Sequence, residues 1–115
     1  MAEAQSRDPN RRAAARAMLR QPATVAYADA TVAVQTVDVG QGGISLLAPR
    51  PIAPGTRCTI AFALPFAEGP ATVCASLKVV YSSYLGPEQF KIGTVFTALD
   101  EETAQLLTRY VSVAG

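Results

Sequence analysis

Between Ala23 and Leu99, hydrophobic and polar residues alternate with the period of β-strands that bury one face. In the run TRCTIAFALP, for example, Cys58, Ile60, Phe62 and Leu64 share one face. The pattern predicts about six strands, covering residues 23–29, 31–39, 44–49, 56–65, 71–85 and 90–99. Short, turn-rich connections between them favour an antiparallel β-barrel, because closure removes exposed strand edges.

After Leu99 the hydrophobic period changes to that of a helix. We predict a C-terminal helix over residues 100–113, with Asp100 as its N-cap and two glutamates in its first turn, where the helix dipole favours negative charge. Its apolar stripe consists of Leu106, Leu107, Tyr110 and Val111. The chain is therefore expected to be all-β with one added helix.

The N-terminal part differs in composition. Residues 1–9 are polar and predicted to be a flexible lead to a single domain spanning residues 10–115, with the barrel at 23–98. The segment 10–22 (NRRAAARAMLRQP) holds four arginines and no acid, and residues 11–20 are expected to be either helical or an ordered loop. Residues 1–20 carry five basic and two acidic residues, or +3, although the whole chain carries only +1. This segment is the expected anion-facing part.

Composition excludes several classes of function. Half of the 115 residues are hydrophobic and 17% are charged, which indicates a globular domain. The chain has no histidine, so Ser-His and Cys-His catalysis are excluded and an enzyme is not expected. The small net charge argues against a DNA- or RNA-binding protein. Cys58 and Cys74 are interpreted as buried or half-buried thiols. No secretory signal or membrane-spanning run is visible, which predicts a cytoplasmic protein without membrane insertion.

Two arginines in the basic segment have the spacing of an anion clamp. Arg12 and Arg16 are four residues apart, so they lie on one side of either a helix or an extended segment. A guanidinium can fork onto phosphate oxygens or onto a guanine edge, and its plane can stack on a base. The alternative is a solvated basic arm.

The segment DVGQGG, from Asp38 to Gly43, is the second candidate. The carboxylate of Asp38 can accept hydrogen bonds from a guanine edge, and the glycines allow backbone amides to approach a phosphate closely. It is neither a phosphate-binding loop of the Walker type nor a dinucleotide-binding fingerprint. The alternative is a glycine-rich bulge or turn.

Together these features resemble the PilZ domain family, whose members bind cyclic di-GMP, from about Asn10 to Val113. The family's pattern has an RxxxR segment, a six-stranded barrel, a D/N-x-S-x-x-G motif after the second strand and a C-terminal helix. The RxxxR motif fits three registers here, Arg7/Arg11, Arg12/Arg16 and Arg16/Arg20. We choose Arg12/Arg16 because it keeps the family's short run before the first strand.

The resemblance implies a role for each matching residue. Arg12 and Arg16 would grip the phosphates and guanine faces of cyclic di-GMP, and Arg11 would add charge. Asp38 would recognise a guanine edge, and Gly43 would hold the loop geometry.

Gly40 stands where the family has serine, and it keeps only its backbone amide as a donor. If this loop lies in the site, restoring the hydroxyl with Gly40→Ser is expected to tighten binding.

The implied function is that of a non-catalytic receptor without a cofactor. Its N-terminal segment would become ordered on ligand binding and change the surface offered to a protein effector, regulating motility, biofilm or virulence-type outputs. The alternative is an adaptor that binds a protein partner without nucleotide.

Overall fold

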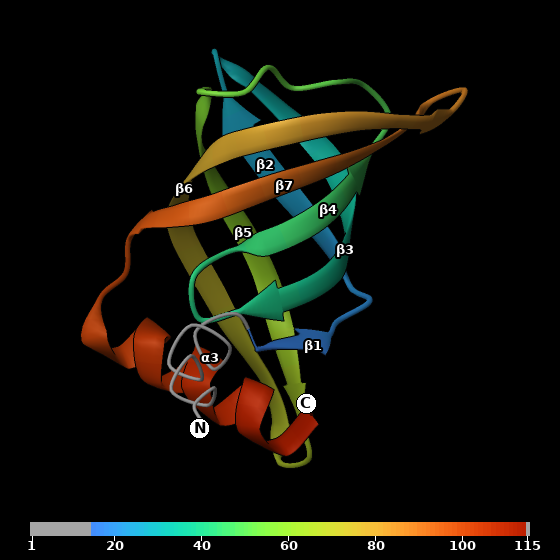
Figure 1. The fold of residues 1–115 in the computed structure, drawn as a ribbon. Helices are drawn as coiled ribbons and strands as arrows, with labels where there is room; N and C mark the ends of the chain where they lie inside the picture. The colour runs from blue at the N-terminus through green and yellow to red at the C-terminus, as the bar shows by residue number, and fades with distance from the viewer. Residues whose placement is uncertain (1–14, 115) are drawn as a thin grey trace, which may run out of the picture.

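The computed structural model describes residues 15–114. Within them, strands and one helix follow the order β1 (Arg16–Met18), β2 (Pro22–Tyr27), β3 (Ala30–Gly40), β4 (Ile44–Ala48), β5 (Arg57–Phe66), β6 (Gly69–Gly86), β7 (Gln89–Ala98) and α3 (Glu101–Ala114). Figure 1 shows the strands wrapped into a barrel, with α3 lying across one end beside β1. The β6–β7 hairpin projects past the opposite end.

Six strands close the barrel. They pair antiparallel in the order β3-β2-β5-β6-β7-β4, and the β3–β4 pairing completes the ring. The predicted antiparallel six-stranded barrel with a C-terminal helix is confirmed. β1 is a seventh strand outside this ring of six. It pairs with the end of β3, along the same edge of β3 that pairs with β2.

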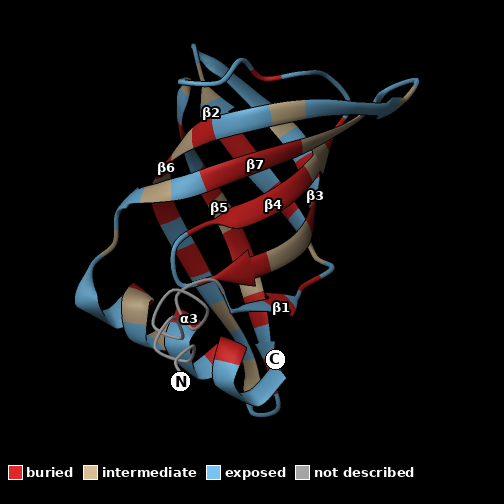
Figure 2. Cartoon of the chain, in the orientation of Figure 1, coloured by how far each residue is buried: buried red, intermediate tan, exposed pale blue. Residues whose placement is uncertain are grey.

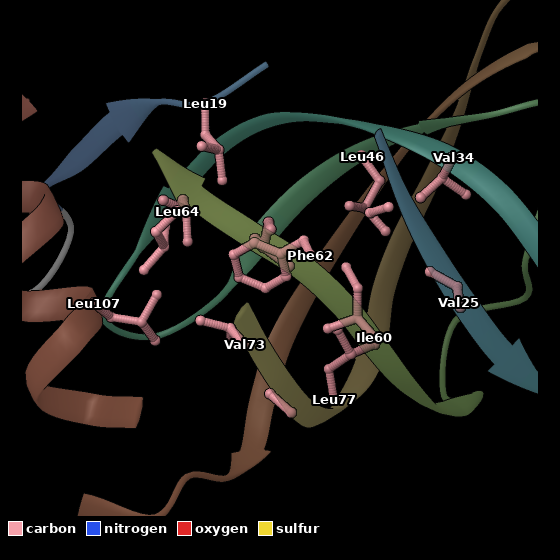
Figure 3. Close-up of a cluster of buried hydrophobic side chains, with 14 of the residues drawn as sticks. Leu19, Val25, Val34, Leu46, Ile60, Phe62, Leu64, Val73, Leu77 and Leu107 are labelled. Atoms are coloured by element: carbon pink, nitrogen blue, oxygen red, sulfur yellow. The ribbon is translucent and has the colours of Figure 1, made fainter. Parts of the chain in front are cut away.

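The alternation seen in the sequence places the core. The four residues of β5 that were expected to share a face are all buried, and so are Val73, Ala75, Leu77 and Val79 of β6. Figure 2 colours the buried residues along the strands, and Figure 3 shows their side chains packed together, with Leu107 of α3 among them. Cys58 is buried, but the expectation for Cys74 was wrong: it is exposed, because its neighbours in β6 take the inward positions.

β1 differs from the helix or ordered loop that the sequence predicts, because residues 16–18 form a strand. Ala17 and Leu19 are 2% and 1% exposed, so β1 and the residue after it both contribute to the core. The break between β1 and β2 is held by the fully buried Thr36, whose hydroxyl accepts a hydrogen bond from the Gln21 N–H and donates one to the Leu19 carbonyl. Pairing with a distant strand therefore overrides the local helix propensity of this alanine-rich segment.

Helix α3 begins where the sequence predicts. The Thr103 N–H donates to Asp100 Oδ1 at 2.7 Å, which confirms the N-cap and lowers the pKa of the Asp100 carboxyl. At the other end of the helix, the Tyr110 hydroxyl donates to the Met18 carbonyl of β1 at 2.8 Å. Within residues 15–114, no helix combines the length and the apolar character needed to cross a membrane.

Candidate ligand-binding groove

The strand registers align four residues across the outer surface of the barrel. Asp38 of β3 lies opposite Ser45 of β4, Ser45 lies opposite Gly93 of β7, and Gly93 lies opposite Tyr81 of β6. These four residues form the floor of an open groove of about 400 Å³. Its other lining residues are Arg16, Val80, Lys91, Thr94 and Val95.

Arg16 closes one end of this groove. Its backbone lies opposite Gly40, and its Nε donates to Asp38 Oδ1 at 2.9 Å while Nη2 lies 2.7 Å from the same oxygen. Nη2 also donates to Ser45 Oγ at 3.3 Å. The side chains of Arg16 and Asp38 remain 36% and 30% exposed. A charged pair that still faces water can exchange its partner for an anionic ligand without desolvating a buried ion.

One aromatic side chain, that of Tyr81, lines the groove. A Cβ on Gly93 would collide with the Tyr81 ring, so glycine lets that ring lie over the β7 backbone. Tyr81 is 40% exposed and lines the groove. Lys91 adds a second cation to the lining. Guanidinium, carboxylate, ammonium and aromatic groups in one shallow groove suit an anionic ligand that also carries planar rings.

Two glycines of the DVGQGG segment are required by close approaches. A Cβ on Gly43 would collide with the Thr94 carbonyl of β7, so only glycine fits without moving that strand. A Cβ on Gly40 would lie 2.8 Å from the Ala15 carbonyl and 3.4 Å from Arg16 Cγ. Gly40 therefore lets the strand that carries Arg16 pack directly against β3. This geometry argues against the expected benefit of Gly40→Ser, because a serine there would push β1 away.

The structure brings Arg16, Asp38, Gly40 and Gly43 together at one end of the barrel. Arg11 and Arg12 lie outside the described residues.

Arg20, from the competing register, lines a different hollow together with Gln35 and Glu88. Sequence reasoning missed Ser45, Tyr81 and Lys91. Each is one polar or aromatic residue within a strand, and only the strand registers reveal that they face the same groove.

Both motif segments are also tied to α3. Tyr110 bonds to β1 through the Met18 carbonyl, two residues after Arg16. Gln41, inside the glycine segment, donates from Nε2 to Thr108 Oγ1 at 3.3 Å. The helix thus forms hydrogen bonds with both β1, which carries Arg16, and the glycine segment. Among residues 15–114, no three His, Cys, Asp or Glu side chains gather as metal ligands.

Comparison with protein families matches residues 10–112 to the PilZ domain. Among solved structures, the fold is similar to the inhibitor of motility MotI/DgrA from Bacillus subtilis, with a TM-score of 0.76 and 14% identity over 86% of this chain. The match covers 48% of that protein, so this chain spans about half of its length. A search of curated protein sequences found no significant match.

Two further similar structures contain cyclic di-GMP. The PilZ domain of YcgR from Escherichia coli gives a TM-score of 0.68 at 14% identity, covering 86% of this chain and 87% of that domain. The PlzA protein of Borreliella burgdorferi gives 0.59 at 16% identity, covering 94% and 44%. At these identities the likeness concerns the fold.

Proposed function

Because the chain belongs to the PilZ domain family, a family of non-catalytic cyclic di-GMP receptors, we propose that it binds cyclic di-GMP in the groove between Arg16 and Tyr81. The observation that carries the proposal is the contact of Arg16 with Asp38 and Ser45 at one end of that groove. It joins the two motifs that the sequence separates by 22 positions.

Each group in the groove has chemistry that suits part of this ligand. The Arg16 guanidinium can turn from Asp38 to a phosphate, with which it forms charge-assisted hydrogen bonds. Asp38, once released, can accept hydrogen bonds from the N1–H and N2–H₂ of a guanine. The exposed ring of Tyr81 can stack on a base, and Lys91 adds positive charge for the second phosphate.

Ser45 offers the hydroxyl that Gly40 lacks. It lies opposite Asp38 in the β3–β4 ladder and already accepts a hydrogen bond from Arg16. We expect its Oγ to contact the bound nucleotide in place of the serine in the family's motif. Glycine at position 40 would then cost the chain the hydroxyl contact of the family's serine, and Ser45 of the next strand would supply a hydroxyl contact nearby.

The segment 10–22 is proposed as the switch of the receptor, with Arg12, and Arg11 beside it, supplying further phosphate contacts. Ligand binding shifts the segment only if the nucleotide binds one arrangement of it better than another. Exchange of the Arg16–Asp38 pair for Arg16–phosphate provides such a difference. The altered surface would be read by a protein effector in motility, biofilm or virulence-type control.

Isothermal titration of cyclic di-GMP into the full chain, with GTP as the control ligand, tests the proposal. We expect micromolar or tighter binding for cyclic di-GMP and none for GTP. Absence of heat and of competition at high ligand concentration would overturn the receptor assignment. An adaptor that uses the same surface for a protein partner would then be the better account of the chain.

A further inference from the structure

The projecting β6–β7 hairpin carries an unusual share of the exposed apolar surface. Seven large hydrophobic side chains are exposed within residues 15–114, and four of them, Val80, Tyr81, Tyr84 and Leu85, lie in one short stretch of β6. Tyr84 and Leu85 are 66% and 56% exposed. Exposed apolar side chains that cluster in this way mark interaction surfaces, whereas scattered ones need no explanation.

The same stretch has an unpaired backbone edge. β5 pairs with β6 only between Gly69 and Lys78, and the hydrogen bonds of Val79 with Gly55 and Thr56 extend the contact by one residue. Beyond Val79, the only strand of the described chain that pairs with β6 is β7. Among residues 15–114, no strand pairs with the other edge of β6 from Val80 to Gly86, so this edge can pair with another strand.

The free edge has no charged residue and no proline, two of the features that protect natural edge strands from pairing. Natural edge strands are protected by charged residues, especially lysine, by proline within the strand, by β-bulges or by being very short. Here no charged residue occurs between Lys78 and Glu88, and Pro87 lies in the turn after the strand. The pairing of β6 with β7 shifts register between Val79 and Tyr81 and again between Tyr84 and Gly86, so it is regular only from Tyr81 to Tyr84. The edge is thus short, uncharged and open.

We infer that this edge is a self-association surface, on which β6 of a second copy pairs antiparallel across a two-fold axis near Ser82 and Ser83. In such a dimer residues 80–86 of one copy face residues 80–86 of the other. Because this segment is uncharged, the pairing requires no complementary charge from another protein. Tyr81, Tyr84 and Leu85 of the two copies come within cross-strand reach of each other. Because the hairpin projects past the barrel, two barrels can stand apart while their hairpins join (Figure 1).

The regular part of the ladder is short, so the buried area is small and we expect a weak dimer, with a dissociation constant in the micromolar range or above. Sedimentation velocity of the full chain over a concentration series, without nucleotide, measures it. The variant Ser83→Lys places like charges opposite or diagonal to each other across the two-fold axis and should weaken the dimer about tenfold or more. The control is Thr72→Lys, an exposed position of β6 that pairs with Ala63 of β5 and lies outside the edge from Val80 to Gly86.

Cross-linking locates the contact independently. In a Cys74→Ser background, Ser83→Cys should be joined to a second copy by a short bis-maleimide, and Thr72→Cys should not. A chain that stays monomeric at every concentration, or a dimer that both lysine variants weaken equally, would overturn the inference. A dimer whose cross-links form at Thr72→Cys alone would also overturn it. None of these readouts requires cyclic di-GMP, so they stand apart from the receptor proposal.

Discussion

Arg16 and Arg109 each pair with a carboxylate, and the surroundings of the two pairs differ. Arg16 meets Asp38 at 2.7 Å inside the groove, where Ser45 is a third partner. Arg109 of α3 meets Glu68 of the β5–β6 turn at 2.5 Å, and its guanidinium lies 4.1 Å above the Phe66 ring. The side chains of the second pair are more exposed, 49% and 60% against 36% and 30% for the first.

The comparison shows that the residues around an ion pair determine what the pair can do. Arg109 is held by a carboxylate and an aromatic face and serves to fasten α3 to the β5–β6 hairpin. Arg16 has polar neighbours that a nucleotide could also engage, and it is carried by a three-residue strand at the edge of the barrel. The same two functional groups attach a helix to a hairpin in one place and, in our proposal, form an exchangeable contact in the other.

The largest expected effect comes from Arg16→Ala. It removes charge-assisted hydrogen bonds to the ligand, each of which contributes about 1.5–3 kcal/mol, so affinity for cyclic di-GMP should fall about tenfold to a hundredfold. Arg109→Ala is the matched control and should leave affinity unchanged. Titration calorimetry of both variants decides the comparison, and equal losses would show that the two pairs do not differ in role.

Gly40→Ser tests whether the strand that carries Arg16 is closely packed. The new Cβ would press on the Ala15 carbonyl, so we expect a loss of about 1–3 kcal/mol of unfolding free energy and no gain in affinity. Gly42→Ser is the control, because a Cβ there meets nothing within 4 Å. Chemical denaturation measures both. Tighter binding with unchanged stability for Gly40→Ser would restore the expectation drawn from the sequence.

Ser45→Ala should have a smaller effect. Loss of one neutral hydrogen bond to the nucleotide is worth about 0.5–1.5 kcal/mol, which is about a few-fold in affinity. Ser76→Ala, outside the groove, is the control. If titration shows no change in affinity for Ser45→Ala, the hydroxyl does not replace the serine missing at position 40.

The smallest effect concerns the pair on α3 and its dependence on pH. The hydrogen bond from Arg109 lowers the pKa of Glu68 below its ordinary 4.5, so the pair's contribution to stability is complete above that value. It is lost as pH falls through the lowered pKa. Thermal unfolding of Glu68→Gln should therefore match the wild type more closely in acid than at neutral pH. A gap between the two proteins that widens in acid would contradict this sign.

The sequence predicted the six barrel strands and α3 because each has one buried face with a clear period. It failed at β1, where the alanine-rich segment around Ala17 favours a helix locally and the partner strand lies more than 20 positions away. In the site, motif spacing identified Arg16, Asp38 and Gly43. Ser45 and Tyr81 could not be found in this way, because only the pairing of β3, β4, β7 and β6 sets them side by side.

The central claim is that cyclic di-GMP occupies the groove between Arg16 and Tyr81. A titration of the isotope-labelled chain with the nucleotide, followed by two-dimensional NMR of the backbone amides, tests it most directly. The account predicts that the largest shifts fall on Ser45, Gly93 and Tyr81, while Glu68 and Arg109 stay unchanged. Saturable shifts confined to any other face of the barrel, or no shifts at all, would contradict it.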